Sequence, residues 1–199
     1  MSKKVIGIFC GSFNPPLYSH FSLAEQLLNE GLDKIIFVPV STKYNKENLA
    51  LDKHRYEMLK LVCDKNPNFE VSDIEFNLLR QPYTIETLLK LQDEYPKCEI
   101  RLIIGTDNLR QIESCQNVEY LLQKFKVIVL SRNEDNIEEI ISQSKLLSTY
   151  RSSIIESHSK IKIHLSSSMV RNLIKERKSV RYLLPDEIID YIEKNNLYI

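Results

Sequence analysis

The sequence contains no tryptophan and only four glycines in 199 residues. Because glycine is so scarce, neither the G-x-G-x-x-G fingerprint of nicotinamide-dependent dehydrogenases nor the glycine-rich loop of P-loop ATPases occurs. The G-x-S-x-G turn that carries the nucleophile of many serine hydrolases is also absent. These absences argue against all three classes of enzyme. The glycines are Gly7, Gly11, Gly31 and Gly105.

Neither sign of charge is in excess, since 27 Lys and Arg residues balance 27 Asp and Glu residues. The chain therefore lacks the basic field that attracts proteins to nucleic acid or membrane surfaces. No apolar run approaches the roughly 20 residues that cross a bilayer, and the polar start Met1–Lys4 leads into a strand rather than a signal peptide. We expect one domain, residues 1–199, in the cytoplasm, with no nucleic-acid or membrane partner.

The four cysteines show no C-x-x-C spacing and no paired framework, so we expect reduced thiols rather than disulfides. The four histidines are scattered without the spacing of a zinc site. We therefore predict that the protein has no structural metal. The residues concerned are Cys10, Cys63, Cys98 and Cys115, and His20, His54, His158 and His164.

Apolar runs alternate with segments of helical periodicity along the chain. The alternation predicts right-handed βαβ units in an α/β, Rossmann-like doubly wound parallel sheet with C-terminal helices. The acidic segment Glu134–Glu139 is most simply the solvated start of a helix. The predicted strands are Val5–Cys10, Lys34–Pro39, Glu99–Gly105 and Lys126–Ser131, and the predicted helices are His20–Asn29, Lys53–Lys65, Thr84–Tyr95, Val118–Lys124, Asn136–Leu147 and Pro185–Asn195.

The segment Gly11–His20, between the first strand and the first helix, is the strongest indication of a site. It turns through Pro15 and Pro16, which cannot continue a hydrogen-bonded ladder. In open α/β sheets such a turn lies at the carboxyl edge, where the next helix directs unpaired N–H groups toward a bound phosphate. We expect His20 to add a donor as a neutral ring, because the helix dipole disfavours its cation. The alternative is that Ser19 and His20 only begin a helix.

A second turn of the same kind lies near the other end of the chain. A short apolar strand, Lys162–His164, precedes Ser166–Ser168 and a helical pattern that contains Arg171. The serines are suited to cap the helix, and capping alone would account for them. A cation in the first turn opposes the helix dipole, so Arg171 makes better sense if an anion such as polyphosphate binds there.

Together the two segments resemble the H-x-G-H and S-S-T-x-x-R signatures of the nucleotidyltransferase superfamily. Within it, nearly the whole chain looks most like the nicotinate or nicotinamide mononucleotide adenylyltransferases, which implies the nucleotidyltransferase type of Rossmann-like fold. Other segments that carry the resemblance, in order, are Phe37–Pro39, His54–Arg55, Phe69–Glu75, Tyr83–Leu88, Ile104–Leu109 and Ser179–Pro185.

The resemblance implies that the phosphate of a pyridine mononucleotide attacks the α-phosphorus of ATP, giving an NAD-type dinucleotide and pyrophosphate in NAD biosynthesis. The attacking phosphate is already an anion, so the reaction needs alignment and charge stabilisation rather than a general base. Mg²⁺ would accompany ATP with few or no protein ligands. The implied catalytic residues are His20, Arg171 and Lys46, and the implied ATP-binding residues are Gly11, Ser12, Phe13, His20, Gly105, Asp107, Arg132, Ser167, Ser168 and Arg171.

The resemblance also implies an acceptor site and a homo-oligomer, but leaves the preference between nicotinate and nicotinamide open. Three positions depart from the family pattern. Leu17 replaces the first histidine, Ser19 replaces a glycine, and Cys115 replaces a tryptophan that stacks on the pyridine ring, a role for which Tyr120 and Phe125 are the candidates. The implied acceptor-binding residues are Ser12, Tyr44, Lys46, Thr84 and Cys115.

Two other functions stay open from the sequence. Pantetheine-phosphate adenylyltransferase shares both signatures, and its second motif often reads S-S-S as here, although the tail Arg181–Pro185 favours the pyridine nucleotide enzyme. A catalytically inactive nucleotide-binding or regulatory protein is the alternative from another class. Leu17 and the missing tryptophan permit it, whereas His20 and Arg171 argue against it.

Overall fold

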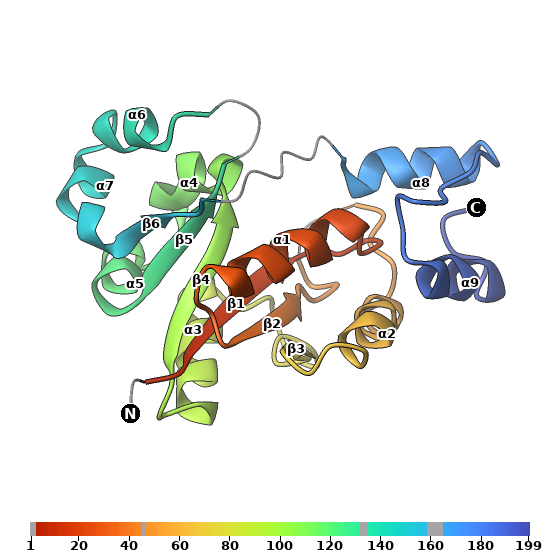
Figure 1. Ribbon diagram of the computed structural model, residues 1–199, viewed down its shortest axis with the longest axis horizontal. Helices are drawn as coiled ribbons and strands as arrows, with labels where there is room; N and C mark the ends of the chain where they lie inside the picture. Colours follow the sequence, from red (N-terminus) through yellow and green to blue (C-terminus); the bar gives the residue numbers. More distant parts are fainter. Residues whose placement is uncertain (1–2, 45–46, 132–134, 159–164) are drawn as a thin grey trace.

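The computed structural model describes residues 3–44, 47–131, 135–158 and 165–199. Six parallel strands form one sheet in the order β3-β2-β1-β4-β5-β6 (Figure 1). This order and the helices on both faces confirm the predicted doubly wound sheet. The strands are β1 (Val5–Gly11), β2 (Lys34–Pro39), β3 (Phe69–Val71), β4 (Glu99–Gly105), β5 (Lys126–Leu130) and β6 (Ile154–Glu156).

Helices connect the strands, and two more follow the sheet. The described helices are α1 (Tyr18–Asn29), α2 (Asp52–Cys63), α3 (Thr84–Glu94), α4 (Thr106–Gln111), α5 (Val118–Lys124), α6 (Ile137–Ser142), α7 (Lys145–Thr149), α8 (Ser167–Lys175) and α9 (Asp186–Lys194), with short 3₁₀ turns at Ile112–Ser114 and Arg151–Ser153.

The predicted elements differ from the structure in one helix and in three short elements. The helix predicted over Asn136–Leu147 is two helices, because Ser144 accepts a hydrogen bond from the Leu147 amide and so caps a new start. Three short elements, β3, β6 and α4, were not predicted at all. The strand predicted at Lys162–His164 lies outside the described residues.

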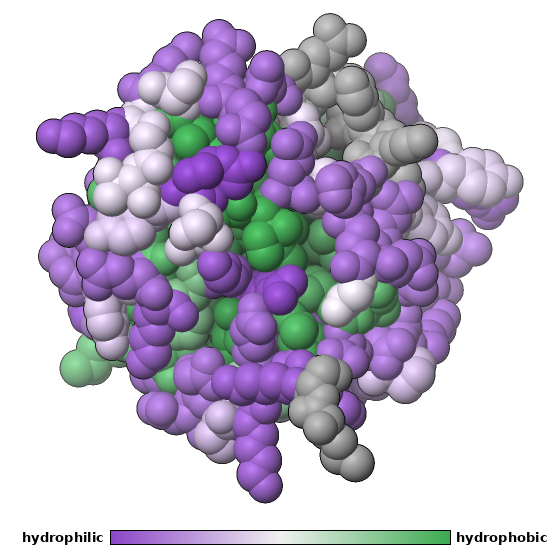
Figure 2. Space-filling model, turned by 60° about the vertical axis from the view of Figure 1, so that its left-hand side comes forward, coloured by the Kyte–Doolittle hydropathy of each residue, from purple (hydrophilic) through white to green (hydrophobic). Residues whose placement is uncertain are grey.

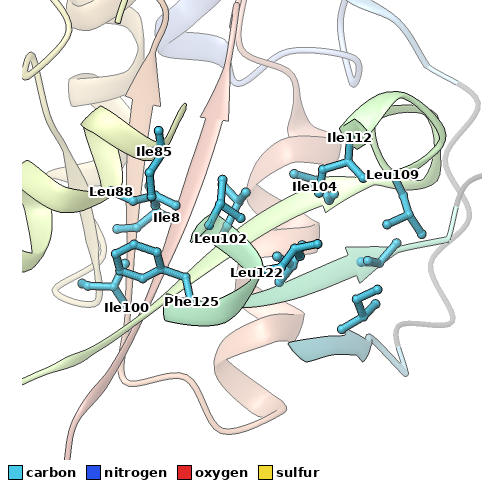
Figure 3. Packing of buried hydrophobic residues seen from close by; sticks show 14 of the residues in the cluster. Ile8, Ile85, Leu88, Ile100, Leu102, Ile104, Leu109, Ile112, Leu122 and Phe125 are labelled. Carbon is cyan, nitrogen blue, oxygen red and sulfur yellow. The ribbon is translucent and has the colours of Figure 1, made fainter. Parts of the chain in front are cut away.

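Alternating side chains on the strands build a hydrophobic cluster on each face of the sheet. On β2, Ile36 and Val38 belong to the cluster under α3, α4 and α5, whereas Ile35 and Phe37 belong to the cluster under α1 and α2. Figure 3 shows the first cluster, with side chains from β1, β4 and α3 to α5 meeting between sheet and helices. Both faces of the central strands are therefore buried, as continuous apolar runs predict.

The C-terminal helices return to the start of α1. The amide of Tyr18, at the first residue of α1, donates to the carbonyl of Leu183 over 3.1 Å, and α8 lies beside this end of α1 (Figure 1). Among the described residues, no helix is both long enough and apolar enough to cross a membrane.

The neighbouring strands β1 and β4 mark the switch point of the sheet, because the chain continues from β1 toward one edge and from β4 toward the other. Ligands of open α/β sheets bind outside the carboxyl ends of strands at such a point. In the view of Figure 2, the surface of the protein is mostly hydrophilic, and hydrophobic residues gather in a hollow near its centre.

Candidate active site

The turn after β1 is shaped by an aromatic side chain. Phe13 has a φ of 45°, which is unusual for a bulky residue, and its ring is buried. A Cβ at Gly11 would lie 3.0 Å from this ring, a tight contact that glycine avoids where Phe13 folds back onto the strand end. The backbone of the predicted ATP-binding residues is thus held in an unusual conformation at the carboxyl edge of the sheet.

His20 is locked in one orientation in the first turn of α1. Its Nδ1 accepts a hydrogen bond of 2.9 Å from the amide of Leu17, and its ring packs edge-on against Phe13 with centroids 5.1 Å apart. Because Nδ1 is an acceptor, the proton of the neutral ring is on Nε2. That His20 donates to a bound phosphate as a neutral ring stays a prediction.

Leu17, which replaces the first histidine of the family pattern, is 1% exposed and belongs to the cluster beneath α1. Ser19 is also buried. The departure at Leu17 therefore adds hydrocarbon to the core, while the Leu17 backbone keeps the role of orienting His20.

The second motif contacts the first through main-chain carbonyls. The Ser167 hydroxyl donates to the carbonyl oxygen of Pro15 over 2.9 Å, and the Arg171 guanidinium donates to that of Asn14 over 2.8 Å and to Ser168 Oγ over 3.0 Å. Ser166 caps α8, as predicted, by accepting from an amide in its first turn. Two segments separated by most of the chain thus lie together at the same edge.

Asn14 is 2% exposed and lies at the centre of these contacts. Its Nδ2 donates to the Asn48 carbonyl over 2.8 Å, and its Oδ1 accepts from the Ala50 amide over 3.0 Å and from the Tyr198 hydroxyl over 2.8 Å. The side chain therefore ties the first turn to the loop that precedes α2 and to the end of the chain. No local pattern around Asn14 indicates this role.

Arg55, in α2, is fully buried. Its guanidinium donates to the carbonyls of Ser12 and Ala50 over 3.0 and 2.9 Å, and to Asp52 over 2.6 Å. Burial lowers the pKa of Arg55, and the adjacent Asp52 carboxylate opposes that shift. The only sequence signal was the His54–Arg55 pair within the family resemblance.

The loop after β2, where the acceptor is expected, is anchored at its start. The Thr42 amide donates to Asp52 over 2.6 Å, and the Ser41 amide donates to Gln81 Oε1 over 3.0 Å. Tyr44 is exposed on this loop. Lys46 lies outside the described residues, so the structure does not place it.

Gln81 in turn donates to Glu75 over 2.5 Å, and the Thr87 hydroxyl donates to the same carboxylate over 2.7 Å. Glu75 is 3% exposed, and this burial raises its pKa, although both hydrogen bonds favour the ionised form. Burial, reinforced by Glu75, also raises the pKa of the Cys10 thiol. Thr84, another predicted acceptor residue, is the first residue of nearby α3 and is half-buried.

At the end of β4, Gly105 is the N-cap of α4 and Asp107 lies in its first turn. The Thr106 hydroxyl and the Arg110 guanidinium both contact Asp135, over 2.5 and 2.8 Å. These hydrogen bonds lower the pKa of Asp135.

The prediction of a solvated acidic helix start holds for α6, which has the exposed Glu138 and Glu139 in its first turn, but Asp135 before it is engaged by α4. Asp135 ties the loop after β5 to α4, and Glu138 pairs with Arg151. Arg132, a predicted ATP-binding residue in the preceding part of this loop, lies outside the described residues.

Phe125 and Tyr120, the two candidates to replace the missing tryptophan, lie in different environments. Phe125 is buried in the hydrophobic cluster, where Figure 3 shows it beside Ile100, so it is not available for stacking. Tyr120 is 47% exposed and lines an open pocket of about 400 Å³ together with Cys115. Burial raises the pKa of the Cys115 thiol. Of the two proposed substitutes for tryptophan, only Tyr120 has an accessible ring.

Hydroxyls, guanidinium groups, a helix N-terminus and an imidazole donor gather at this edge, and such groups bind anions. Within the described part of the chain, no group of three or more His, Cys, Asp or Glu residues is placed to hold a metal ion. The fold and this site define a nucleotidyltransferase of the cytidylyltransferase-like class, and the family model of that description, Cytidylyltransferase-like, matches residues 8–173.

The chain belongs to the nicotinate-nucleotide adenylyltransferase family. It is 37% identical to a probable nicotinate-nucleotide adenylyltransferase of Carboxydothermus hydrogenoformans, with 100% of both chains covered. It is 36% identical to one from Caldicellulosiruptor saccharolyticus, over 97% of this chain and 98% of the relative. Its fold is similar to that of Plasmodium falciparum nicotinic acid mononucleotide adenylyltransferase complexed with NaAD, with a TM-score of 0.79, 22% identity, and 98% and 97% of the two chains covered. The family resemblance predicted from the sequence is confirmed.

Proposed function

We propose that the protein transfers the AMP moiety of ATP to nicotinate mononucleotide, releasing pyrophosphate and forming the dinucleotide precursor of NAD. The observation that supports this most directly is the contact between Arg171 and the Asn14 carbonyl, which joins the two nucleotidyltransferase motifs at one edge of the sheet. Membership of the adenylyltransferase family supplies the class of acceptor.

In this reaction the chain supplies donors and alignment rather than a base. The attacking phosphate is ionised near neutral pH, so the barrier is lowered by holding it in line and by stabilising charge on the transferring phosphate. His20 would donate from Nε2 to that phosphate, because Nδ1 is already engaged with the Leu17 amide. Arg171 and the N-terminus of α8 would stabilise the phosphates of ATP.

The remaining assignments follow the family resemblance. The backbone of Gly11, Ser12 and Phe13 would lie along ATP, and Gly105 and Asp107 would contact its adenosine. The complete proposed ATP set is Gly11, Ser12, Phe13, His20, Gly105, Asp107, Arg132, Ser167, Ser168 and Arg171, and the acceptor set is Ser12, Tyr44, Lys46, Thr84 and Cys115.

ATP would bring Mg²⁺ to the site. Hydroxyls and cations surround the two motifs among the described residues, whereas hard divalent ions prefer carboxylate, carbonyl and phosphate oxygens. The metal would therefore be bound by phosphate oxygens and water, and it would neutralise charge on the polyphosphate.

The test is pyrophosphate release from ATP and Mg²⁺ with three separate acceptors: nicotinate mononucleotide, nicotinamide mononucleotide and phosphopantetheine. We expect turnover with nicotinate mononucleotide that is lost in His20→Ala. Turnover with phosphopantetheine instead would identify pantetheine-phosphate adenylyl transfer. Binding of ATP with no turnover for any acceptor would indicate a nucleotide-binding protein and contradict the proposal.

A further inference from the structure

Tyr198 lies beyond α9 and reaches back to the first motif. Its backbone has a φ of 65°, and Asn196, two residues earlier, has a φ of 49°. Left-handed conformations at non-glycine residues are uncommon and are kept where surrounding contacts compensate for the strain. The Leu197 amide, which donates to the Ile192 carbonyl over 3.0 Å, anchors this turn to α9. The tail is thereby folded so that the Tyr198 ring points at Asn14.

The phenol is the donor in this contact. Its hydroxyl is 2.8 Å from Asn14 Oδ1, which also accepts from the Ala50 amide. Burial raises the pKa of Tyr198, although the nearby cations Arg171 and Arg55 act in the opposite direction. The phenol hydroxyl therefore keeps its proton at neutral pH and can donate it to the amide oxygen of Asn14 in a hydrogen bond.

Asn14 transmits this contact to both motifs. With two donors on Oδ1, the amide nitrogen must face the Asn48 carbonyl, so one orientation of the side chain is fixed. The carbonyl of the same residue receives the Arg171 guanidinium. The position of Arg171 relative to the turn after β1 thus depends on how rigidly Asn14 is held.

We propose that Tyr198 is a positioning residue of the adenylyl-transfer site, whose hydroxyl fixes Asn14 and thereby aligns Arg171 with the turn after β1. This inference rests on the proposed function, because its kinetic readout is adenylyl transfer. Tyr198 touches no reacting atom in this scheme, so its removal should slow turnover more than it weakens substrate binding.

The experiment compares Tyr198→Phe with Tyr191→Phe, a matched removal of one phenol hydroxyl. Tyr191 lies on α9, and its hydroxyl contacts Nδ1 of His54, a residue of neither motif, over 3.0 Å. We expect Tyr198→Phe to lower kcat about tenfold with KM for ATP changed less than about threefold, while Tyr191→Phe stays within about twofold of the parent. Melting temperatures of the two variants should agree within a few degrees. Equal kinetic effects of the two substitutions would overturn the proposal.

A double-mutant cycle separates action through Asn14 from general loss of structure. If Tyr198 acts through Asn14, Tyr198→Phe should cost less than about twofold in an Asn14→Ala background. A full tenfold loss in that background would contradict the proposed route.

A second readout requires no turnover. NMR signals of the Asn14 side-chain amide should shift in Tyr198→Phe and stay unchanged in Tyr191→Phe, and an unshifted signal in Tyr198→Phe would overturn the contact. If the parent protein transfers no AMP while this shift occurs, the proposed function fails and the contact stands.

Discussion

The Arg171 guanidinium donates to the main-chain carbonyl of Asn14 over 2.8 Å, across a sequence separation of 157 residues. A second branch of the same guanidinium donates to Ser168 Oγ over 3.0 Å. One side chain therefore orients both the turn after β1 and the first turn of α8, between which the polyphosphate of ATP is proposed to bind.

Replacing Arg171 by Lys should lower kcat/KM for ATP about 30-fold without unfolding the protein. Lysine keeps the charge but lacks the planar fork that engages two acceptors at once. Steady-state pyrophosphate release measures the effect. Arg151→Lys, at a surface pair with Glu138, serves as the control and should stay near parent activity. Parent-like kinetics in Arg171→Lys would show that charge alone suffices.

Substitutions of His20 can separate the roles of its two ring nitrogens, Nδ1 and Nε2. Asparagine places a polar atom near the position of Nδ1, so His20→Asn should retain most of the stability but lose about 100-fold or more in kcat. Glutamine extends an amide toward the position of Nε2, and His20→Gln should keep more activity than His20→Asn. Parallel measurements of kcat and thermal unfolding test both expectations. The reverse order of activity would mean that the Leu17 contact, rather than the Nε2 donor, limits the rate.

Arg55→Met should reduce the free energy of unfolding by about 3 kcal/mol, because it leaves Asp52 and two carbonyls without their buried donor. Urea unfolding followed by circular dichroism would measure the loss. Arg101→Met removes a partly exposed pair with Glu99 and should cost less than about 1 kcal/mol. Similar losses in the two variants would argue that Arg55 is not the anchor that its burial indicates.

Glu75→Gln should change the pH dependence of stability. Burial raises the pKa of Glu75, so the folded state holds this proton more tightly than the unfolded state does. The contribution of Glu75 to the free energy of unfolding is most favourable below the ordinary pKa of a glutamate. It is lost as the pH rises through the raised pKa. The stability of the parent relative to Glu75→Gln should therefore fall between about pH 4 and the raised pKa, as urea unfolding at successive pH values would show.

Glu70→Gln provides a control of opposite sign. Partial burial disfavours the ionised form, but hydrogen bonds from Lys34 and Tyr95 lower the pKa of Glu70 overall. The contribution of Glu70 to the free energy of unfolding is present above the ordinary glutamate pKa. It is lost as the pH falls through the lowered pKa. If both variants changed the stability profile in the same direction, the assignment of Glu75 as a buried, raised-pKa group would be wrong.

The central strands of the sheet could be predicted from the sequence because long apolar runs indicate buried parallel strands. The predicted strands Lys34–Pro39 and Glu99–Gly105 and the helix Val118–Lys124 match the structure residue for residue. β3 and β6 have three residues each, too few for a periodic pattern, and their pairing depends on neighbours that are distant in the chain.

The two motifs were found for a similar reason, since each is a contiguous turn before a helix. Arg55, Glu75 and the Asn14 side chain could not be assigned from local pattern. Their partners come from other segments and include main-chain groups, which every residue type carries. Which buried polar group meets which partner is settled only when the elements pack.

The turn after β1 is held through its main chain by other parts of the protein. The carbonyls of Ser12, Asn14 and Pro15 accept hydrogen bonds from Arg55, Arg171 and Ser167. Every residue type carries such a carbonyl, so these three hydrogen bonds do not depend on which residues form the turn, although the Phe13 ring and the Asn14 side chain also shape it. Side chains of α2 and α8 thus help to set the position of the turn through contacts that any residues of the turn could make.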